Sequence, residues 1–220
     1  MSLSRCRLYL ITPPQIADVD AFRADLETVL GAGDVACLQI RLKTEDDMID
    51  EAATRRIAKA VISPVQEAGV AVVINDSPAL ALELGADGVH LGPTDMSVAE
   101  ARKLLGPDAI VGASAKSSYH AAMEAGEAGA DYVAFGAFYP TTTKAGATPA
   151  SPDLLSNWQA MTELPCVAIG GITVENARPL VAAGADFLAV SSGVWSAEGG
   201  PAQAVADFNA LFDELDPDAG

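Results

Sequence analysis

The sequence predicts an α/β fold, namely a single (β/α)8 barrel of the TIM-barrel type that covers residues 1–220. Short apolar runs alternate with segments of helical periodicity, and eight such pairs can be placed along the chain. Neither a linker nor a change in composition divides the sequence. Alanine and valine dominate an apolar fraction of 50%, which is typical of helices packed closely on a parallel sheet. The alternative fold is an eight-stranded doubly wound sheet.

Prolines, glycines and a capping serine delimit the elements of the first half. Pro13 stops the first strand, and Gly31 closes the first helix, whose apolar residues recur at helical spacing. The second helix is expected to be interrupted or kinked at Pro64. Ser77 and Pro78 supply the N-cap and the first residue of the third helix. The expected strands cover 7–12, 35–42, 70–74 and 88–91, and the expected helices cover 20–30, 45–68, a segment from 78, and 97–105.

A Gly-Ala-Asp triplet recurs between helix and strand, and it continues through the second half. It occurs at 85–87, 129–131 and 184–186, with a Gly-Ala-Gly-Asp variant at 31–34. A glycine that ends a helix before a short turn into a strand explains the recurrence. The remaining expected strands cover 109–112, 132–136, 166–169 and 187–190, and the remaining helices cover 118–128, 153–162, 174–183 and 201–215.

The composition argues against several classes of function. A formal net charge of −17 and an isoelectric point near 4.2 disfavour a nucleic-acid partner, because phosphate backbones require a basic face. The chain has no apolar run of about 20 residues and no secretory signal pattern, so no membrane partner is expected and the predicted location is the cytoplasm. Cys6, Cys37 and Cys166 lie far apart in apolar runs, so we expect buried, unreactive thiols.

Polar side chains follow the second strand. Gln39, Arg41 and Lys43 stand at alternate positions and therefore share one face. On a sheet covered by helices, three such residues on one face would be costly to bury. In a barrel they would face the mouth, where active sites form at the carboxyl ends of the strands.

Glycines and hydroxyl groups follow the later strands. Gly170-Gly171 after the seventh strand lets the backbone approach an anion, and Ser191-Ser192-Gly193 after the eighth offers N–H and hydroxyl donors. Thr141-Thr142-Thr143-Lys144 after the sixth adds hydroxyl and ammonium donors. Ordinary turns are the alternative, but the joint placement of these segments favours a phosphate site.

Two aspartates follow neighbouring strands. Asp76 comes directly after the third strand and Asp95 just after the fourth, with Asn75 as a neutral oxygen ligand. Two carboxylates and a diphosphate are ligands that Mg²⁺ prefers. The alternative is that each aspartate only caps a helix, but the cations after the second and sixth strands favour a metal–diphosphate site.

The two histidines receive no catalytic assignment. His90 lies inside the fourth strand, where a hydrogen-bonded core histidine is expected, and His120 lies on a helix and is expected to face solvent. No Ser/His/Asp or Cys/His arrangement supports nucleophilic hydrolysis.

Seven segments occur in a fixed order along nearly the whole chain. They are QIRLK (39–43), IND (74–76), GADGVHLGPTD (85–95), GAS (112–114), ADYVAFGAFYPTTTK (130–144), AIGGI (168–172) and AVSSG (189–193). As a set, they resemble the thiamine-phosphate synthase family, also called thiamine-phosphate pyrophosphorylase. The resemblance implies a (β/α)8 barrel and a Mg²⁺-dependent transferase. Such an enzyme joins 4-amino-5-hydroxymethyl-2-methylpyrimidine diphosphate to 4-methyl-5-(2-phosphoethyl)thiazole and releases diphosphate.

The resemblance also implies roles for individual residues. The Mg²⁺ would be held by Asp76 and Asp95. The pyrimidine diphosphate would be held by Gln39, Arg41, Lys43, Asn75, Ser114 and Lys144, of which Arg41, Lys43, Ser114 and Lys144 are the candidate catalytic residues. The thiazole phosphate would be bound by Thr141, Thr143, Gly171, Ser191 and Ser192. The implied partners are small phosphorylated molecules, and the habit of the family suggests a homodimer.

Two residues depart from the family pattern. Pro93 stands where the family often has Gln, and Lys116 stands where it often has His. Lys116 is expected either to add a contact to the diphosphate or to crowd the pyrimidine. A related thiazole tautomerase branch has its catalytic histidine at this position, so Lys116 argues against tautomerase activity. The remaining alternatives are a catalytically weak homologue that binds thiamine intermediates and another phosphate-binding barrel enzyme.

Overall fold

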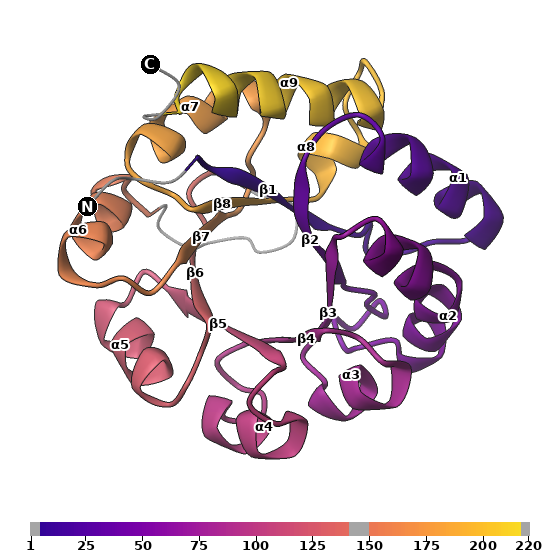
Figure 1. Cartoon of the computed structure of the whole chain (residues 1–220), viewed down its shortest axis with the longest axis horizontal. Coiled ribbons are helices and arrows are strands. Elements are labelled where there is room, and N and C mark those ends of the chain that lie inside the picture. The colour runs from indigo at the N-terminus through magenta and orange to yellow at the C-terminus, as the bar shows by residue number, and fades with distance from the viewer. Residues whose placement is uncertain (1–4, 141–149, 217–220) are drawn as a thin grey trace.

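Parallel strands and helices alternate along the chain in the computed structural model, which describes residues 5–140 and 150–216 (Figure 1). The strands are β1 (Arg7–Ile11), β2 (Val35–Ile40), β3 (Ala71–Asn75), β4 (Gly88–Leu91), β5 (Ile110–Lys116), β6 (Tyr132–Gly136), β7 (Cys166–Ile169) and β8 (Phe187–Val190). Each strand pairs in parallel with the next, and β8 pairs with β1, so the sheet closes. The (β/α)8 barrel predicted from the sequence is confirmed, and the doubly wound sheet is excluded.

The helices form a ring around the barrel (Figure 1). They are α1 (Val19–Leu30), α2 (Glu51–Glu67), α3 (Pro78–Leu84), α4 (Val98–Leu105), α5 (Tyr119–Glu127), α6 (Asp153–Met161), α7 (Val174–Ala182), α8 (Ser192–Trp195) and α9 (Pro201–Glu214). Ser77 caps α3 as expected, with its hydroxyl accepting from the backbone N–H of Leu80. None of the helices in the described ranges is long and apolar enough to cross a membrane.

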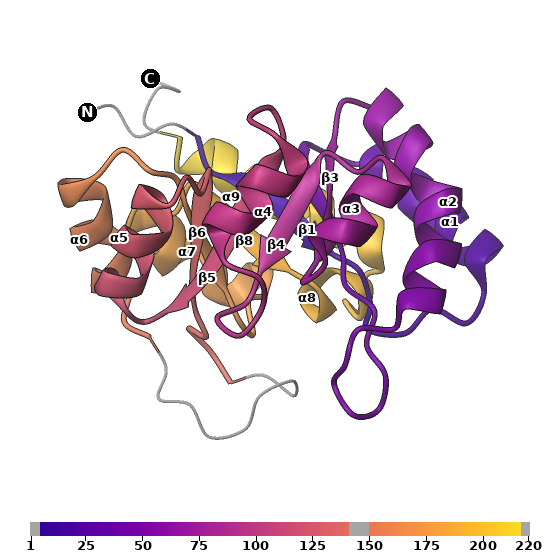
Figure 2. The same ribbon diagram turned by 90° about the horizontal axis from the view of Figure 1, so that it is seen from below.

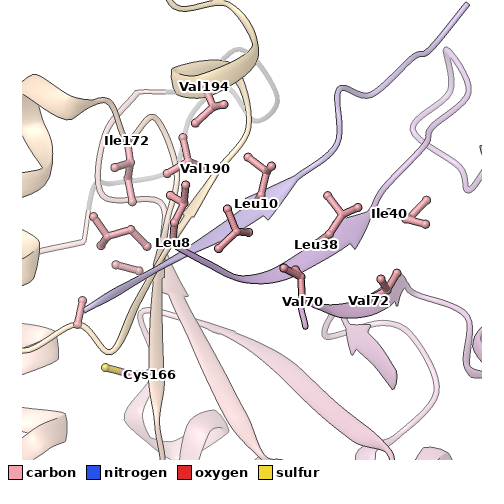
Figure 3. Packing of buried hydrophobic residues seen from close by; sticks show 14 of the residues in the cluster. Leu8, Leu10, Leu38, Ile40, Val70, Val72, Cys166, Ile172, Val190 and Val194 are labelled. Carbon is pink, nitrogen blue, oxygen red and sulfur yellow. The ribbon is translucent and has the colours of Figure 1, made fainter. Parts of the chain in front are cut away.

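Successive residues of each strand point to opposite sides of the sheet. Leu8, Leu10, Leu38 and Ile40 belong to the larger apolar cluster, which packs β1 and β2 against the helices (Figure 3). A smaller cluster fills the interior of the barrel and comprises Tyr9, Ile11, Cys37, Val73, Tyr132, Ala134, Val167 and Ala189. The barrel is therefore a packed core with a mouth at one end.

The aspartates of the Gly-Ala-Asp triplets tie neighbouring strands together at their amino ends. Asp131, which precedes β6, accepts a hydrogen bond of 2.7 Å from the backbone N–H of Val111 in β5. Arg102 of α4 donates to the same carboxylate at 2.6 Å. The other two triplets repeat this arrangement, with Asp87 accepting from Val72 and Gln66, and Asp186 accepting from Cys166 and Gln159. The triplet thus contributes a strand anchor as well as the turn expected from its glycine.

Two expected boundaries are wrong by four or more residues. The second helix begins at Glu51 and not at 45, because Asp50 is its N-cap and accepts from the backbone N–H of Ala53 at 2.9 Å. Residues 44–50 instead form a loop, which a β-bridge between Lys43 and Ile49 holds in place. Strand β5 continues to residue 116, beyond its expected end at 112. Helix α2 continues through Pro64, so the interruption expected there is not found.

The three cysteines are buried and form no disulfide, as expected. Burial raises the pKa of Cys37 and of Cys166 to about 12, so both remain thiols at neutral pH.

Candidate active site

One end of the barrel carries α8 and the loop between β2 and α2 (Figure 2). On the inner face, Gln39 and Asn75 are both buried, and Gln39 Nε2 donates a hydrogen bond of 2.5 Å to Asn75 Oδ1. His90 on β4 is the register partner of Asn75, and Ser114 follows on the inner face of β5. Alternation along four consecutive strands therefore gathers a row of polar groups near the carboxyl ends of the strands.

Lys43, Asp76 and Asp95 form a charged cluster at the mouth. Lys43 Nζ lies 2.6 Å from Asp76 Oδ2, and the two side chains are only 13% and 22% exposed. Asp76 has a φ of 64° immediately after β3. The backbone N–H of Gly92 donates to Asp95 Oδ2 at 2.7 Å. A Cβ placed on Gly92 would lie 2.9 Å from Asp95 Oδ2 and 4.0 Å from Asp76 Oδ1, so the two carboxylates converge beside this glycine.

The cluster fits a divalent cation by its donor chemistry. Burial raises the pKa of Asp95, the N–H of Gly92 lowers it, and the carboxylate of Asp76 raises it again. Two carboxylates beside the ammonium of Lys43 leave an excess of negative charge on hard oxygen atoms, which are the ligands that Mg²⁺ prefers. Within 5–140 and 150–216, no group of three or more His, Cys, Asp or Glu side chains is placed to hold a metal. A cation at this pair would therefore take further ligands from water and phosphate oxygens.

The remaining expected cations differ in their surroundings. Arg41 Nη2 lies 3.4 Å from Asp47 Oδ1 in the loop after β2, and its side chain is 21% exposed. Lys116 is exposed at the end of β5, where its φ is 53°. Lys144 lies outside the described residues, as do Thr141 and Thr143.

His90 connects the polar row to two buried tyrosines. Its Nε2 lies 2.9 Å from Ser114 Oγ, and its Nδ1 lies 3.0 Å from Tyr132 Oη. Tyr132 Oη in turn lies 2.8 Å from Tyr9 Oη. Burial lowers the pKa of His90 to about 4, with the carboxylate of Asp76 raising it and Arg41 lowering it further, so the imidazole is neutral at pH 7.

The hydrogen-bonded core histidine predicted from the sequence is confirmed, but its contact with a predicted site residue was missed. Alternation gave a usable signal, because His90 and Ser114 are both inward-facing residues of adjacent strands. The contacts of His90 with Tyr132 had no such signal.

The segments after β7 and β8 meet near the end of β1. Ser191 Oγ donates to the backbone carbonyl of Thr12 at 3.1 Å, and Ser192 is exposed as the first residue of α8. Gly171 has a φ of 63°, and a Cβ there would lie 2.4 Å from the carbonyl oxygen of Pro140, so only glycine suits the position. Asn176, which the sequence reading missed, donates from Nδ2 to the carbonyl of Gly171 at 2.9 Å and fixes this turn.

Comparison with known proteins places the chain in a family. The family model described as thiamine monophosphate synthase matches residues 8–194. The thiamine-phosphate synthase of Hyphomonas neptunium is 69% identical over 211 residues, which cover 96% of each chain. That of Rhodospirillum centenum is 58% identical over 211 residues, or 96% of this chain and 99% of its own.

A solved structure agrees with these relatives. The thiamine phosphate pyrophosphorylase of Pyrococcus furiosus superposes with a TM-score of 0.79 at 30% identity and covers 96% of this chain and 98% of its own. A 3-hexulose-6-phosphate synthase from Salmonella typhimurium has a TM-score of 0.69 at 13% identity and so shares the fold alone. On the family match, the two high identities and this shared fold, the chain belongs to the thiamine monophosphate synthase family.

Proposed function

We propose that this chain condenses 4-amino-5-hydroxymethyl-2-methylpyrimidine diphosphate with 4-methyl-5-(2-phosphoethyl)thiazole to give thiamine phosphate and diphosphate. Membership of the family and the synthases among its relatives support this activity. The structural observation that carries it is the cluster of Lys43, Asp76 and Asp95 next to the polar inner face of the barrel. An ammonium group and a pair of metal-binding carboxylates suit a diphosphate, whereas they offer little to an uncharged substrate.

The pyrimidine is assigned to the inner face. Gln39 and Asn75 are buried amides, and they can exchange hydrogen bonds with the ring nitrogen and the amino group of an aminopyrimidine. Ser114 stands further along the same row and can donate to a diphosphate oxygen. Lys43 and Arg41 come from the end of β2 and bring positive charge to the same side.

The reaction follows from the distribution of charge. The bond between the pyrimidine methylene carbon and the diphosphate oxygen breaks, and its electron pair leaves with the diphosphate. The electron-rich aminopyrimidine stabilises the cation that remains, and the thiazole nitrogen forms the new bond to that carbon. Arg41, Lys43 and Ser114 stabilise the charge that grows on the departing oxygens, and Lys144 is assigned the same role from the sequence. No general base is required, because the attacking nitrogen carries no proton.

Mg²⁺ held by Asp76 and Asp95 would neutralise part of the diphosphate charge. The chain's own contribution is to hold the two carboxylates together, through the N–H of Gly92 on Asp95 and the ammonium of Lys43 on Asp76.

The thiazole phosphate is assigned to the segments after β7 and β8. Gly171 gives the turn after β7 its left-handed backbone, and Ser191 and Ser192 supply hydroxyl groups after β8. Thr141 and Thr143 are assigned to the same phosphate from the sequence.

The direct test is diphosphate release from purified protein supplied with both substrates and Mg²⁺, with each component omitted in turn. We expect release only when all three are present, with thiamine phosphate formed in equal amount. Binding of the pyrimidine diphosphate without turnover would instead identify a catalytically weak homologue. Failure to bind either substrate would point to another phosphate-binding barrel enzyme. The cytoplasmic location and the homodimer expected from the sequence stay predictions.

A further inference from the structure

A chain of hydrogen bonds crosses the interior of the barrel and ends at Ser114. It runs from Tyr9 Oη to Tyr132 Oη at 2.8 Å, from Tyr132 Oη to His90 Nδ1 at 3.0 Å, and from His90 Nε2 to Ser114 Oγ at 2.9 Å. Tyr9, Tyr132 and His90 are 3%, 7% and 7% exposed, whereas Ser114 is partly exposed. The inner members are therefore closed to water, and the last member can reach a ligand.

Gly112 makes this chain possible. His90 lies on β4 and Tyr132 on β6, and Gly112 of β5 is the register partner of both. A Cβ on Gly112 would lie 1.9 Å from Cζ of Tyr132, so the tyrosine ring occupies the space that any other residue would fill. The rings of Tyr132 and His90 are stacked, with centroids 5.6 Å apart and an angle of 17° between their planes. The ring of Tyr132 thus reaches across one strand to fix the imidazole.

This row of hydrogen bonds can run in one of two directions, because a neutral imidazole has one N–H and each hydroxyl group has one hydrogen. In the first, Tyr132 donates to His90 Nδ1, and Nε2–H donates to Ser114 Oγ. In the second, Ser114 donates to Nε2, and Nδ1–H donates to Tyr132. The two directions differ at Ser114, because only the first leaves the hydroxyl hydrogen of Ser114 free to bind a ligand.

We propose that His90 is a positioning residue that donates from Nε2–H to Ser114 Oγ, so that the Ser114 hydroxyl gives its own hydrogen to an anionic oxygen of the bound diphosphate. The proposed substrate is a diphosphate, and its anionic oxygens accept hydrogen bonds but donate none. In the second direction Ser114 would present only lone pairs to that anion. Tyr132 can donate to Nδ1 and is thus compatible with the tautomer that avoids this conflict.

The tautomer can be observed in the intact protein by ¹⁵N NMR of the imidazole rings. The chain has two histidines, and His120 is 84% exposed on α5, so a His120→Gln variant assigns the signals of His90. With saturating inorganic diphosphate and Mg²⁺, we expect His90 to carry its proton on Nε2. A proton on Nδ1, or no response of the His90 signals to diphosphate, would overturn the proposal.

A pair of variants tests the kinetic consequence, which rests on the proposed function. The side-chain nitrogen of Gln can take the place of Nε2, whereas that of Asn takes the place of Nδ1 and cannot reach Ser114. We expect His90→Asn to lower kcat/KM roughly ten- to hundredfold, as for a lost hydrogen bond to a group that binds a charge, and His90→Gln to retain most of it.

The same pair in a Ser114→Ala background shows whether His90 acts through Ser114. In that background, we expect His90→Gln and His90→Asn to have the same kcat/KM. A difference that persists without the Ser114 hydroxyl would refute the positioning role, and so would equal losses in the original background. If the native protein showed no turnover at all, the proposed function would fail, while the NMR result would still decide the tautomer.

Discussion

Asp76 and Asp95 bring two carboxylates together beside the ammonium group of Lys43. Burial and the Asp76 carboxylate raise the pKa of Asp95, while the N–H of Gly92 and the charge of Lys43 lower it. A divalent cation would add positive charge beside the two carboxylates. The backbone N–H of Gly92 keeps the Asp95 carboxyl group in place for it.

An Asp95→Asn substitution tests this assignment. Asparagine can still accept from the N–H of Gly92 through its amide oxygen, so the turn at 92–95 is retained while the charge is lost. We expect the Mg²⁺ concentration needed for half-maximal turnover to rise roughly tenfold or more, because even outer-shell partners of a metal contribute that much. Asp108→Asn is the matched control, since it removes the same charge from an exposed residue before β5. Near-normal turnover of Asp95→Asn at low Mg²⁺ would contradict the assignment.

Substitution of Lys116 distinguishes the two roles that were expected for it, a contact to the diphosphate or crowding of the pyrimidine. The side chain is exposed, and its backbone has a left-handed φ of 53° at the end of β5, near Ser114. An exposed ammonium attracts a diphosphate weakly, so we expect Lys116→Ala to raise KM for the pyrimidine diphosphate roughly two- to fivefold with little change in kcat. Steady-state kinetics at constant Mg²⁺ measure this. A fall in KM would show instead that the lysine stem crowds the substrate.

Residues differ in how far the sequence alone could place them. Asp76 and Asp95 follow adjacent parallel strands, so their proximity was predictable from chain order. The contact between Tyr132 and His90 was not, because it passes over Gly112 and depends on the ring orientation in a closed barrel.

At the scale of elements, the Gly-Ala-Asp triplets do more than end helices. Their aspartates accept from the backbone N–H groups of β3, β5 and β7, near the amino ends of these strands. Each carboxylate also accepts from a side chain of the helix that comes before that strand, namely α2, α4 or α6, so one residue joins two strands and a helix. The three aspartates therefore stabilise the end of the barrel that lies opposite the mouth, at the amino ends of the strands, which we call the floor.

Substitution of Asp131 separates this support from catalysis. Asp131→Ala removes the acceptor of the Val111 N–H and the carboxylate partner of Arg102, whose guanidinium keeps its bonds to backbone carbonyls, and we expect the free energy of unfolding to fall by about 1–2 kcal/mol. Asp131→Asn keeps an oxygen acceptor and should lose less. Urea denaturation measures both, and turnover at saturating substrate should be unchanged. A loss of turnover without a loss of stability would mean that the floor and the mouth are coupled.

The second helix shows why element boundaries were harder to predict. Several aspartates near its start can cap a helix, and the selected cap, Asp50, stands just before the first buried turn. The buried positions Thr54, Ile57 and Val61 begin the helical periodicity after residue 50, and this signal favoured the later start. The preceding loop takes its shape from the bridge between Lys43 and Ile49, a contact that no local propensity specifies.

At the scale of the whole molecule, the closed sheet joins the first strand to the last. β1 pairs with both β2 and β8, so no strand of the barrel has a free edge. The two tryptophans lie in different parts of this barrel, so their fluorescence can follow the unfolding of each part separately. Trp158 on α6 packs against Phe135 of β6, and Trp195 on α8 donates from Nε1 to the carbonyl of Ile11 in β1 at 2.7 Å.

We expect the barrel to unfold as one cooperative domain, because every strand is hydrogen-bonded to two neighbours. In Trp195→Phe the fluorescence follows Trp158, and in Trp158→Phe it follows Trp195. Within each variant, the fluorescence transition in urea should coincide with the loss of helix seen by circular dichroism. Separated midpoints would show that the two parts unfold independently and that the chain is two units.

The sequence by itself determined the order of the eight strands and of the helices between them, apart from the short helix α8, and it assigned the candidate site to one end of the barrel with the chemical types of its residues. These follow from periodicity, from turn residues and from the rule that parallel strands place their carboxyl ends together. The contacts of the Gly-Ala-Asp aspartates and the row of hydrogen bonds from Tyr9 to Ser114 were decided only by tertiary structure. Each of these depends on contacts between residues far apart in the chain, and local pattern carries no information about such distances.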